Sequence, residues 1–403
     1  MRRVAALAVV STVLVGSPAA MAAGQVRQAA AKQASPAACP AWDGVQPANS
    51  AFAFVAGVAV LPDCDAWAVG GTNNPIRMLI EKFAGSSWTR QPVSVPKFKT
   101  ELFSVAATST DNAWAVGNQH PPGQNIQDLI MGWTGSTWAP ATPPAIPGAS
   151  SSLLTGVAAT SASNAWAVGN YGIGHVHQTL ILHWNGTAWA KVPSPDPSGL
   201  KRGSYLTSVT ADSPDDAWAA GYYNSTKFAG AHTLTLHWNG KKWSWVPSPT
   251  PTTAHQGMLF GVAATSARNA WAVGYTTKPS DSTVILHWNG RTWSQQRSPN
   301  PPNINGPPHI FRLDAVAATS AGNAWAVGYL GPSDWMPEIL HWNGKAWRWK
   351  SVPPEVPNYV LYAVAASPAG GVWAAGFYNP NLSSGIRPPD SFMLRWNGTS
   401  WQA

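Results

Sequence analysis

The sequence predicts an all-β fold, a seven-bladed β-propeller with four antiparallel strands in each blade. One segment recurs seven times at a spacing of about 50 residues, a period typical of propellers and other repeat arrays. Its clearest copy, residues 153–189, reads LLTGVAATSASNAWAVGNYGIGHVHQTLILHWNGTAW. Each copy contains four short stretches of alternating small, β-branched and aromatic residues, which indicate strands, and no stretch has a helical period.

Tryptophans mark the repeat, and most of the 24 in the chain fall into three columns. The first column, in the AWAVG-type segment, comprises Trp67, Trp114, Trp166, Trp218, Trp271, Trp325 and Trp373. The second, in the HWNG-type segment, comprises Phe83, Trp133, Trp184, Trp238, Trp288, Trp342 and Trp396. The third comprises Trp88, Trp138, Trp189, Trp243, Trp293, Trp347 and Trp401. Because buried tryptophans remove large apolar areas from water, we expect the columns to form the core rather than a ligand-stacking ladder.

The turns of the repeat follow from short polar motifs. In the third copy the strands are expected at residues 154–160, 165–168, 179–184 and 187–192. A Ser-x-x-Asn motif at 161–164 predicts a tight turn between the first two strands. Asn185-Gly186 predicts a type I′ hairpin between the last two, in which both central residues have positive φ.

The second strand of each copy indicates how blades stack. In the third copy Trp166 and Val168 point to one side of the strand, and Ala165 and Ala167 point to the other. We therefore expect the large side chains of one blade to pack against the alanine side of the next.

The N-terminus has the features of a secretory signal peptide at residues 1–23. Arg2 and Arg3 precede an apolar run, and Ala20-Met21-Ala22 supplies small residues for cleavage. The twin arginines leave the Sec and Tat export routes both open. The run is too short to span a membrane, so we expect a secreted, extracellular protein without a membrane span. Residues 24–50 are expected to form a flexible segment, and residues 51–403 the propeller, whose first blade begins near Phe52.

Two cysteines suggest how the N-terminal segment attaches to the ring. An even cysteine count in an exported protein favours a disulfide, here between Cys39 and Cys64 in the first turn of blade one. The chain ends at Ala403, which leaves little length for a last fourth strand. Either residues 41–45 complete the outer edge of blade seven, or side-chain packing between blades seven and one closes the ring.

Charge and histidine placement argue against several function classes. The formal net charge is +8, but the lysines and arginines are scattered, which gives no support to nucleic-acid binding. Four histidines share one repeat position and would lie far apart around the ring, so we expect structural roles and no metal site: His183, His237, His287 and His341. We expect a monomer without a cofactor.

The AWAVG and HWNG-x-x-W segments carry a resemblance to the secreted bacterial β-propellers whose blades contain these motifs. The resemblance covers about 350 residues. HWNGTAW is distantly similar to the Asp-box hairpin of sialidase-type propellers, with Asn in place of Asp, and Gly70-Gly71 resembles the kelch double glycine. The Gly-His and Trp-Asp pairs of WD40 propellers are missing. The resemblance implies a propeller fold and no particular activity.

Candidate binding residues lie on one face of the predicted propeller. The connections between second and third strands and between blades differ from copy to copy and emerge together, and we name this side the variable-loop face. Variable loops on a rigid scaffold commonly carry binding. Aromatic planes beside amides and hydroxyls suit sugars or peptides, and such residues follow the AWAVG segment: Asn118, Asn170, Tyr171, Tyr222, Tyr223, Tyr275, Tyr329 and Phe377. Alternatively, these side chains only cover the blade edge.

The start of the innermost strand supplies three further candidates, Glu101, Arg312 and Asp314. Glu101 and Arg312 are expected at one position in blades two and six, and Asp314 at a position occupied elsewhere by Phe103, Phe260 or Tyr362. Arg312 and Asp314 are two residues apart, so they share a strand face and are expected to pair. Four aspartates precede third strands and could form a carboxylate ring or a Ca²⁺ site: Asp128, Asp281, Asp334 and Asp390.

The sequence leaves the function between two classes. The first is a secreted binding or interaction module that recognises extracellular glycans or proteins on the variable-loop face. The alternative is a secreted carbohydrate-active enzyme, a hydrolase or lyase, that uses the acidic residues at the channel mouth. Paired carboxylates in a deep pocket would favour the enzyme. A shallow surface rich in aromatic side chains and without paired carboxylates would favour binding. A purely structural surface protein would have neither, and no catalytic residue is assigned.

Overall fold

The computed structural model describes residues 39, 42, 44, 46, 53–73, 75–93, 98–199, 202–225, 230–251, 256–277, 282–299, 310–331, 335–353, 359–367, 369–378 and 390–403. The predicted signal peptide and most of the expected flexible segment lie outside these residues. Pro36–Ala403 form one compact unit, which contains every described residue.

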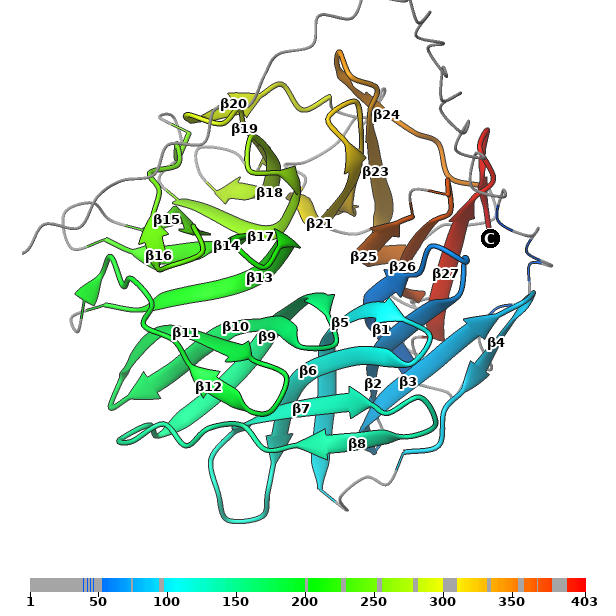
Figure 1. The fold of residues 1–403 in the computed structure, drawn as a ribbon. Coiled ribbons are helices and arrows are strands. Elements are labelled where there is room, and N and C mark those ends of the chain that lie inside the picture. Colours follow the sequence, from blue (N-terminus) through cyan, green and yellow to red (C-terminus); the bar gives the residue numbers. More distant parts are fainter. Residues whose placement is uncertain are drawn as a thin grey trace, which may run out of the picture. The chain divides into compact units, whose positions relative to one another are not determined.

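Seven four-stranded antiparallel sheets surround a central axis, as the repeat predicts (Figure 1). In every sheet the strands follow chain order from the centre outward, and innermost strands of neighbouring sheets lie side by side. The innermost strands are β1 (Ala53–Val60), β5 (Lys99–Ser109), β9 (Ser151–Ser161), β13 (Ser204–Ser213), β17 (Gln256–Ser266), β21 (Ile310–Ser320) and β25 (Tyr359–Ala366). No helix occurs among the described residues.

The second strands carry the AWAVG-type segment and the third strands the HW segment. The second strands are β2 (Ala66–Asn73), β6 (Asn112–His120), β10 (Asn164–Ile173), β14 (Asp216–Asn224), β18 (Asn269–Thr277), β22 (Asn323–Gly331) and β26 (Val372–Tyr378). The third strands are β3 (Ile76–Ala84), β7 (Gln127–Trp133), β11 (Val176–Trp184), β15 (Ala231–Trp238), β19 (Ser282–Trp288), β23 (Met336–Trp342) and β27 (Asp390–Trp396).

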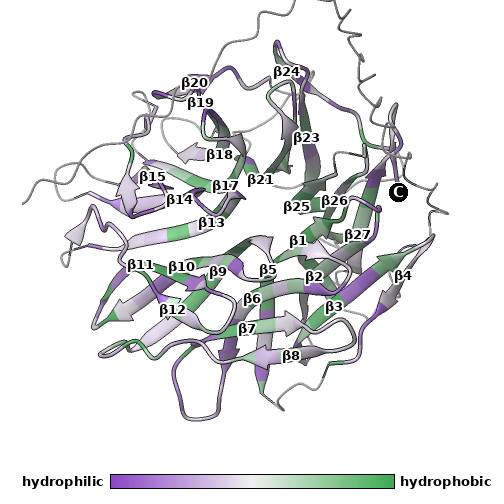
Figure 2. Cartoon of the chain, viewed as in Figure 1, coloured by the Kyte–Doolittle hydropathy of each residue, from purple (hydrophilic) through white to green (hydrophobic). Residues whose placement is uncertain are grey.

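The fourth strands are short. They are β4 (Ser87–Arg90), β8 (Trp138–Ala141), β12 (Trp189–Lys191), β16 (Trp243–Trp245), β20 (Trp293–Gln296), β24 (Trp347–Trp349) and β28 (Trp401–Gln402). Figure 2 shows hydrophobic residues along the inner strands and hydrophilic residues in many of the connecting loops. No helix among the described residues is long and apolar enough to cross a membrane.

Three aromatic rings from the three columns pack together at every blade interface, an arrangement we call the aromatic clamp. Trp166 of blade three lies 4.9 Å from Trp238 and 5.2 Å from Trp243 of blade four, the latter in an edge-on arrangement at 89°. The other interfaces have the same geometry, with first-to-second-column distances of 4.8 or 4.9 Å. Each pair contributes about 0.5–1.5 kcal/mol beyond its buried area. The clamp therefore fixes how one blade sits on the next.

The alanine side of each blade receives these large residues, as predicted. Trp114 and Val116 of blade two share a buried cluster with Ala165 and Ala167 of blade three. The tryptophans of the second column lie at the edge of the expected core, and Trp184, for example, is only half-buried. Its indole Nε1 donates to the carbonyl of Ala162 at 3.0 Å, so it can sit at the edge of the core without losing a hydrogen bond.

The predicted type I′ turn at Asn185-Gly186 is wrong. Gly186 has a φ of 91°, but Asn185 does not have positive φ. The side chain of Asn185 accepts hydrogen bonds from the amides of Thr187 and Ala188 at 2.9 and 3.0 Å, which closes a four-residue loop between Trp184 and Trp189. The asparagine is therefore used for its side-chain acceptor rather than for its tolerance of positive φ.

The ring closes between blades seven and one through the aromatic clamp and through the N-terminal segment. Trp373 of blade seven lies 4.9 Å from Phe83 and 5.2 Å from Trp88 of blade one, and Trp42 packs edge-on against Trp373 at 5.1 Å. Gln46 donates from Nε2 to the carbonyl of Met393 at 3.1 Å and accepts from its amide at 2.9 Å.

Gln46 replaces an interaction that a longer fourth strand makes elsewhere. In blade three, for example, the amide of Val192 donates to the carbonyl of Ile181, which is the position equivalent to Met393. The strand β28 is too short to do this. The N-terminal segment thus contributes to blade seven through the side chain of Gln46, one residue beyond the expected 41–45. This occurs together with direct packing of blades seven and one.

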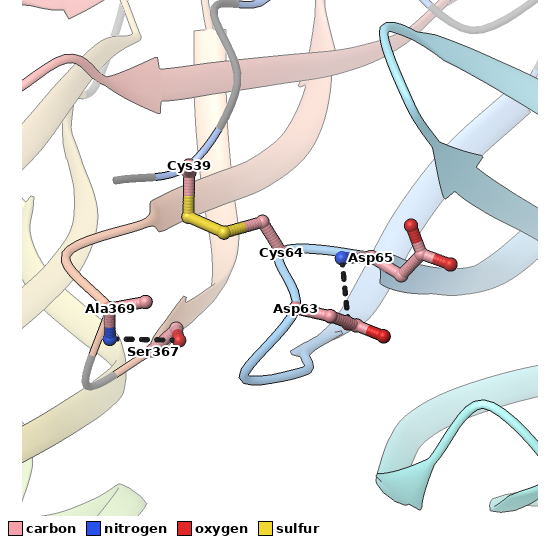
Figure 3. Close-up of a disulfide and its surroundings, with 6 residues drawn as sticks. All are labelled: Cys39, Asp63, Cys64, Asp65, Ser367 and Ala369. Carbon is pink, nitrogen blue, oxygen red and sulfur yellow. Dashed lines mark hydrogen bonds between the residues drawn. A yellow bond between two sulfur atoms is a disulfide. The ribbon is translucent and has the colours of Figure 1, made fainter. Parts of the chain in front are cut away.

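The predicted disulfide joins Cys39 to Cys64 (Figure 3). Cys64 lies in the turn between β1 and β2 of blade one, and its backbone has a φ of 76°. Cys39 lies against blade seven, since a Cβ added to Gly371 would be 2.8 Å from the Cys39 sulfur. The bond therefore spans the junction at which the ring closes.

Candidate functional site at the channel mouth

Each innermost strand contains a β-bulge that turns one side chain toward the central axis. In blade six, Leu313 pairs with Gly328 and Ala315 with Val327, so Asp314 is left without a partner. The residues in this position are Ala56, Phe103, Thr155, Thr207, Phe260, Asp314 and Tyr362. Bulges commonly re-aim a side chain next to a functional site.

The bulge explains the invariant glycine of the AWAVG-type segment. A Cβ at Gly328 would lie 1.9 Å from the carbonyl oxygen of Arg312, and the equivalent glycines of the other blades have the same contact within 0.1 Å. Only glycine leaves room for this close approach of two backbones. The repeat motif that identifies the fold therefore also shapes the channel.

All seven bulge residues line one cavity of about 510 Å³, together with Phe54, Arg312 and Phe377. Phe54 and Arg312 precede their bulges, and Phe377 follows the VWAAG segment, so the cavity opens on the variable-loop face. We call it the mouth cavity. Its volume is in the range of small-molecule sites. A narrower cavity of about 220 Å³ lies deeper and is lined by a ring that includes Val58, Val105 and Val209.

One ion pair is the charged feature of the mouth cavity. Arg312 donates from Nε to Asp314 Oδ1 at 2.6 Å, as the spacing of the two residues predicts, and its Nη2 lies 2.6 Å from the same oxygen. The guanidinium lies 4.1 Å above the ring of Phe260. The pKa of Asp314 is raised to about 6, because the effect of burial exceeds the opposing effect of Arg312. The second carboxyl oxygen, Oδ2, is buried and has no hydrogen-bond donor among the described residues.

The rest of the lining is mostly aromatic. Its aromatic side chains come from blades one, two, five and seven: Phe54, Phe103, Phe260, Tyr362 and Phe377. Blades three and four contribute Thr155 and Thr207 instead. The hydroxyls of these threonines donate to backbone carbonyls of the next blade at 2.8 and 2.9 Å. They therefore join blades and offer no free donor to the cavity.

Three predicted binding residues form a layer behind the lining. Tyr275 stacks on Phe260 at 5.6 Å, Tyr222 stacks on Tyr205 at 4.9 Å, and Tyr329 stacks on Trp335 at 4.7 Å. The Arg312 guanidinium lies within 5.8 Å of both Tyr275 and Tyr329. Burial raises the pKa of the Tyr222 and Tyr329 hydroxyls. This layer positions Phe260 and Arg312.

The remaining predicted residues lie apart from the mouth cavity. Asn118, Asn170 and Tyr171 are buried, and Asn170 Oδ1 lies 2.9 Å from His177 Nδ1. Tyr223 is half-buried and contacts Trp245 at 5.9 Å. Glu101 is half-buried and does not line the cavity.

Of the four aspartates, Asp128 alone has a described side chain. The repeated histidines pack against first-column tryptophans: His183 lies 4.2 Å from Trp166, and its Nε2 lies 2.7 Å from Asn164 Oδ1.

The sequence identified Arg312, Asp314 and Phe377 as candidates. It did not identify the other lining residues: Phe54, Ala56, Phe103, Thr155, Thr207, Phe260 and Tyr362. A bulge has no residue signature of its own. The usable signal is the glycine that it requires on the facing strand, because that glycine fixes which inner residue is left unpaired.

The sequence matches no protein-family model and no curated protein. Among solved structures, the chain is similar to YCF48 from Cyanidioschyzon merolae, with 15% identity, a TM-score of 0.51, and coverage of 85% of this chain and 95% of that one. It is also similar to a polysaccharide lyase of family PL25, an ulvan lyase, with 9% identity, a TM-score of 0.51, and coverage of 89% and 94%. A fucose-binding lectin from Aleuria aurantia has 14% identity, a TM-score of 0.44, and coverage of 74% and 91%. The likeness to YCF48 and to the ulvan lyase shows the fold.

Proposed function

We propose that this protein is an exported binding module that holds a sugar unit of an extracellular glycan in the mouth cavity. The observation that carries the proposal is the lining: aromatic rings share the cavity wall with Asp314, whose buried Oδ2 is an acceptor without a donor among the described residues. A sugar ring offers apolar faces for stacking and hydroxyls that donate hydrogen bonds. Leaving a buried acceptor unsatisfied costs about 1–3 kcal/mol, which a donating hydroxyl would recover.

The charges of the cavity favour binding over hydrolysis. Glycoside hydrolysis generally uses two carboxyl groups about 5–10 Å apart. Asp314 is the one carboxyl group among the described residues that line the cavity, and Arg312 already occupies its other oxygen. The Arg312–Asp314 pair therefore serves to orient a ligand.

Export rests on separate observations. Residues 1–23 have the charge and apolar pattern of a signal peptide, and the chain carries a disulfide, which persists in oxidising compartments. Extracellular glycans are the ligands that such a compartment presents.

A glycan array with the purified chain from residue 24 onward tests the proposal. Binding to one or more glycans is expected, and Phe377→Ala should weaken it at least ten-fold, because this half-buried ring forms one wall. Trp245→Ala is the matched control, since Trp245 is 45% exposed on an outer strand and does not line the cavity. Thermal unfolding of both variants verifies the fold.

Equal binding by wild type and Phe377→Ala, or no binding to any glycan, would overturn the proposal. If chromatography showed that the protein shortens the polysaccharide it binds, the result would instead support the carbohydrate-active enzyme.

A further inference from the structure

A second cavity, of about 560 Å³, lies between blades two and three on the variable-loop face. It shares no lining residue with the mouth cavity. One wall is the loop from β6 to β7, and the other is the connection from β8 to β9. We call it the seam cavity.

The walls of the seam cavity are rich in amides and hydroxyls. The polar lining residues are Gln119, Gln124, Asn125, Gln127, Asp128, Ser150, Ser151 and Ser152. Among the described residues, neither lysine nor arginine lines it, and Asp128 is its one ionisable group. The lining thus supplies acceptors and neutral donors, and one negative charge when Asp128 is ionised.

Asp128 lacks the partner that its position has in other blades. The equivalent Thr179 and Thr233 donate to carbonyls of the connection that follows their own blade, at 3.1 and 3.3 Å. Asp128 is 5% exposed, and its Oδ1 has no hydrogen-bond partner among the described residues. Its backbone amide donates to Ser152 Oγ at 3.3 Å.

Asn118 faces Asp128 across the strand pair and adds a second buried acceptor to the site. The two residues are direct partners in the β6–β7 ladder, so their side chains lie on the same side of the sheet. Asn118 Oδ1 is also buried without a donor among the described residues. Two neighbouring acceptors with no donor favour a positively charged, donating group beside them. Burial raises the pKa of Asp128 to about 7, despite the contact with Ser152, and a cation would stabilise its ionised form.

We propose that the seam cavity binds an amino sugar, with the ammonium group beside the carboxylate of Asp128. The ring hydroxyls of such a ligand match the glutamine amides and the serines of the two walls. Ile126, Pro143 and Ile146 provide apolar surface for the faces of the sugar ring. A lysine side chain carries the same ammonium but would leave most of the amides and hydroxyls unused. This site is separate from the mouth cavity and does not depend on the function proposed for it.

Binding of a glucosamine hexasaccharide and its fully N-acetylated counterpart, measured by calorimetry at pH 7, tests the proposal. The two ligands differ in the ammonium groups, so we expect the deacetylated one to bind at least ten-fold tighter. Asp128→Asn keeps the shape and removes the charge, and should abolish that preference. Asp111→Asn is the matched control, because Asp111 is an exposed carboxylate in the turn between β5 and β6.

Three outcomes would overturn the proposal. They are equal affinity for the two hexasaccharides, an equal loss of binding in Asp111→Asn and Asp128→Asn, and tighter binding of a lysine hexapeptide than of the amino-sugar ligand. Phe377→Ala should leave this binding unchanged, which distinguishes failure at the seam cavity from failure at the mouth cavity.

Discussion

Removing the Cys39–Cys64 bond should destabilise the ring at the junction of blades seven and one. The bond closes a separation of 25 residues, and the loop-entropy relation assigns about 3.5 kcal/mol to a loop of that length at 25 °C. The same segment carries Trp42 and Gln46, which contact blade seven. Serine at position 64 would adopt the same backbone conformation as cysteine, so Cys39→Ser/Cys64→Ser changes the cross-link and not the backbone strain.

Urea unfolding followed by tryptophan fluorescence measures this effect on the chain from residue 24 onward. The double variant should lose about 3–4 kcal/mol of unfolding free energy. Wild type unfolded with a reductant should give the same value. Hydrogen exchange locates the change: the amide of Met393, which donates to Gln46, should exchange faster in the variant.

An unchanged urea midpoint would refute the reasoning about closure. So would a loss of stability without faster exchange at Met393, because the segment would then hold blade seven without the disulfide. Gln46→Ala, which removes both hydrogen bonds to Met393 and keeps the disulfide, separates the two contributions.

Two substitutions test the other structural claims. Gly328→Ala should destabilise the protein by several kcal/mol in thermal unfolding, because the new Cβ would lie 1.9 Å from the carbonyl oxygen of Arg312. Gly331→Ala in the same strand is the control and should be nearly neutral, because its Cβ would meet nothing closer than 3.7 Å. Equal effects would contradict the bulge argument. Glu338 is fully buried, and burial raises its pKa well above 4.5, so the folded protein binds a proton that the unfolded chain releases above that pH. Wild-type stability therefore falls as pH rises from 4.5 toward the raised pKa. Glu338→Leu should be more stable than wild type by a margin that grows from pH 5 to pH 8, and a constant margin would contradict this.

The repeat made the fold predictable. Residues recurring every blade, such as the first-column Trp166, have the same environment in every copy, so periodicity alone identified the strands, the alanine side and the seven blades. The hairpin at Asn185 was misassigned because asparagine is favoured in turns for two reasons. It tolerates positive φ, and its side chain accepts hydrogen bonds from nearby amides, and the sequence does not distinguish the two. Closure through Gln46 could not be derived, since it depends on one side chain meeting a strand edge about 350 residues away.

The sites were less predictable, because they depend on departures from the repeat. Arg312 and Asp314 stood out as two charges on one innermost strand, and their pairing followed from strand geometry. The layering of Tyr275 behind Phe260 did not, since both occupy aromatic positions in the sequence. The seam cavity arises from two unrelated connections, and its signal was Asp128 in a position where blades three, four and five carry threonine.

A crystal structure of the protein with a glycan selected from the array would show where the sugar binds. We expect a sugar ring in the mouth cavity, between the rings of Phe260 and Phe377, with a hydroxyl donating to Asp314 Oδ2. A ligand bound elsewhere, with the mouth cavity holding only solvent, would contradict this expectation.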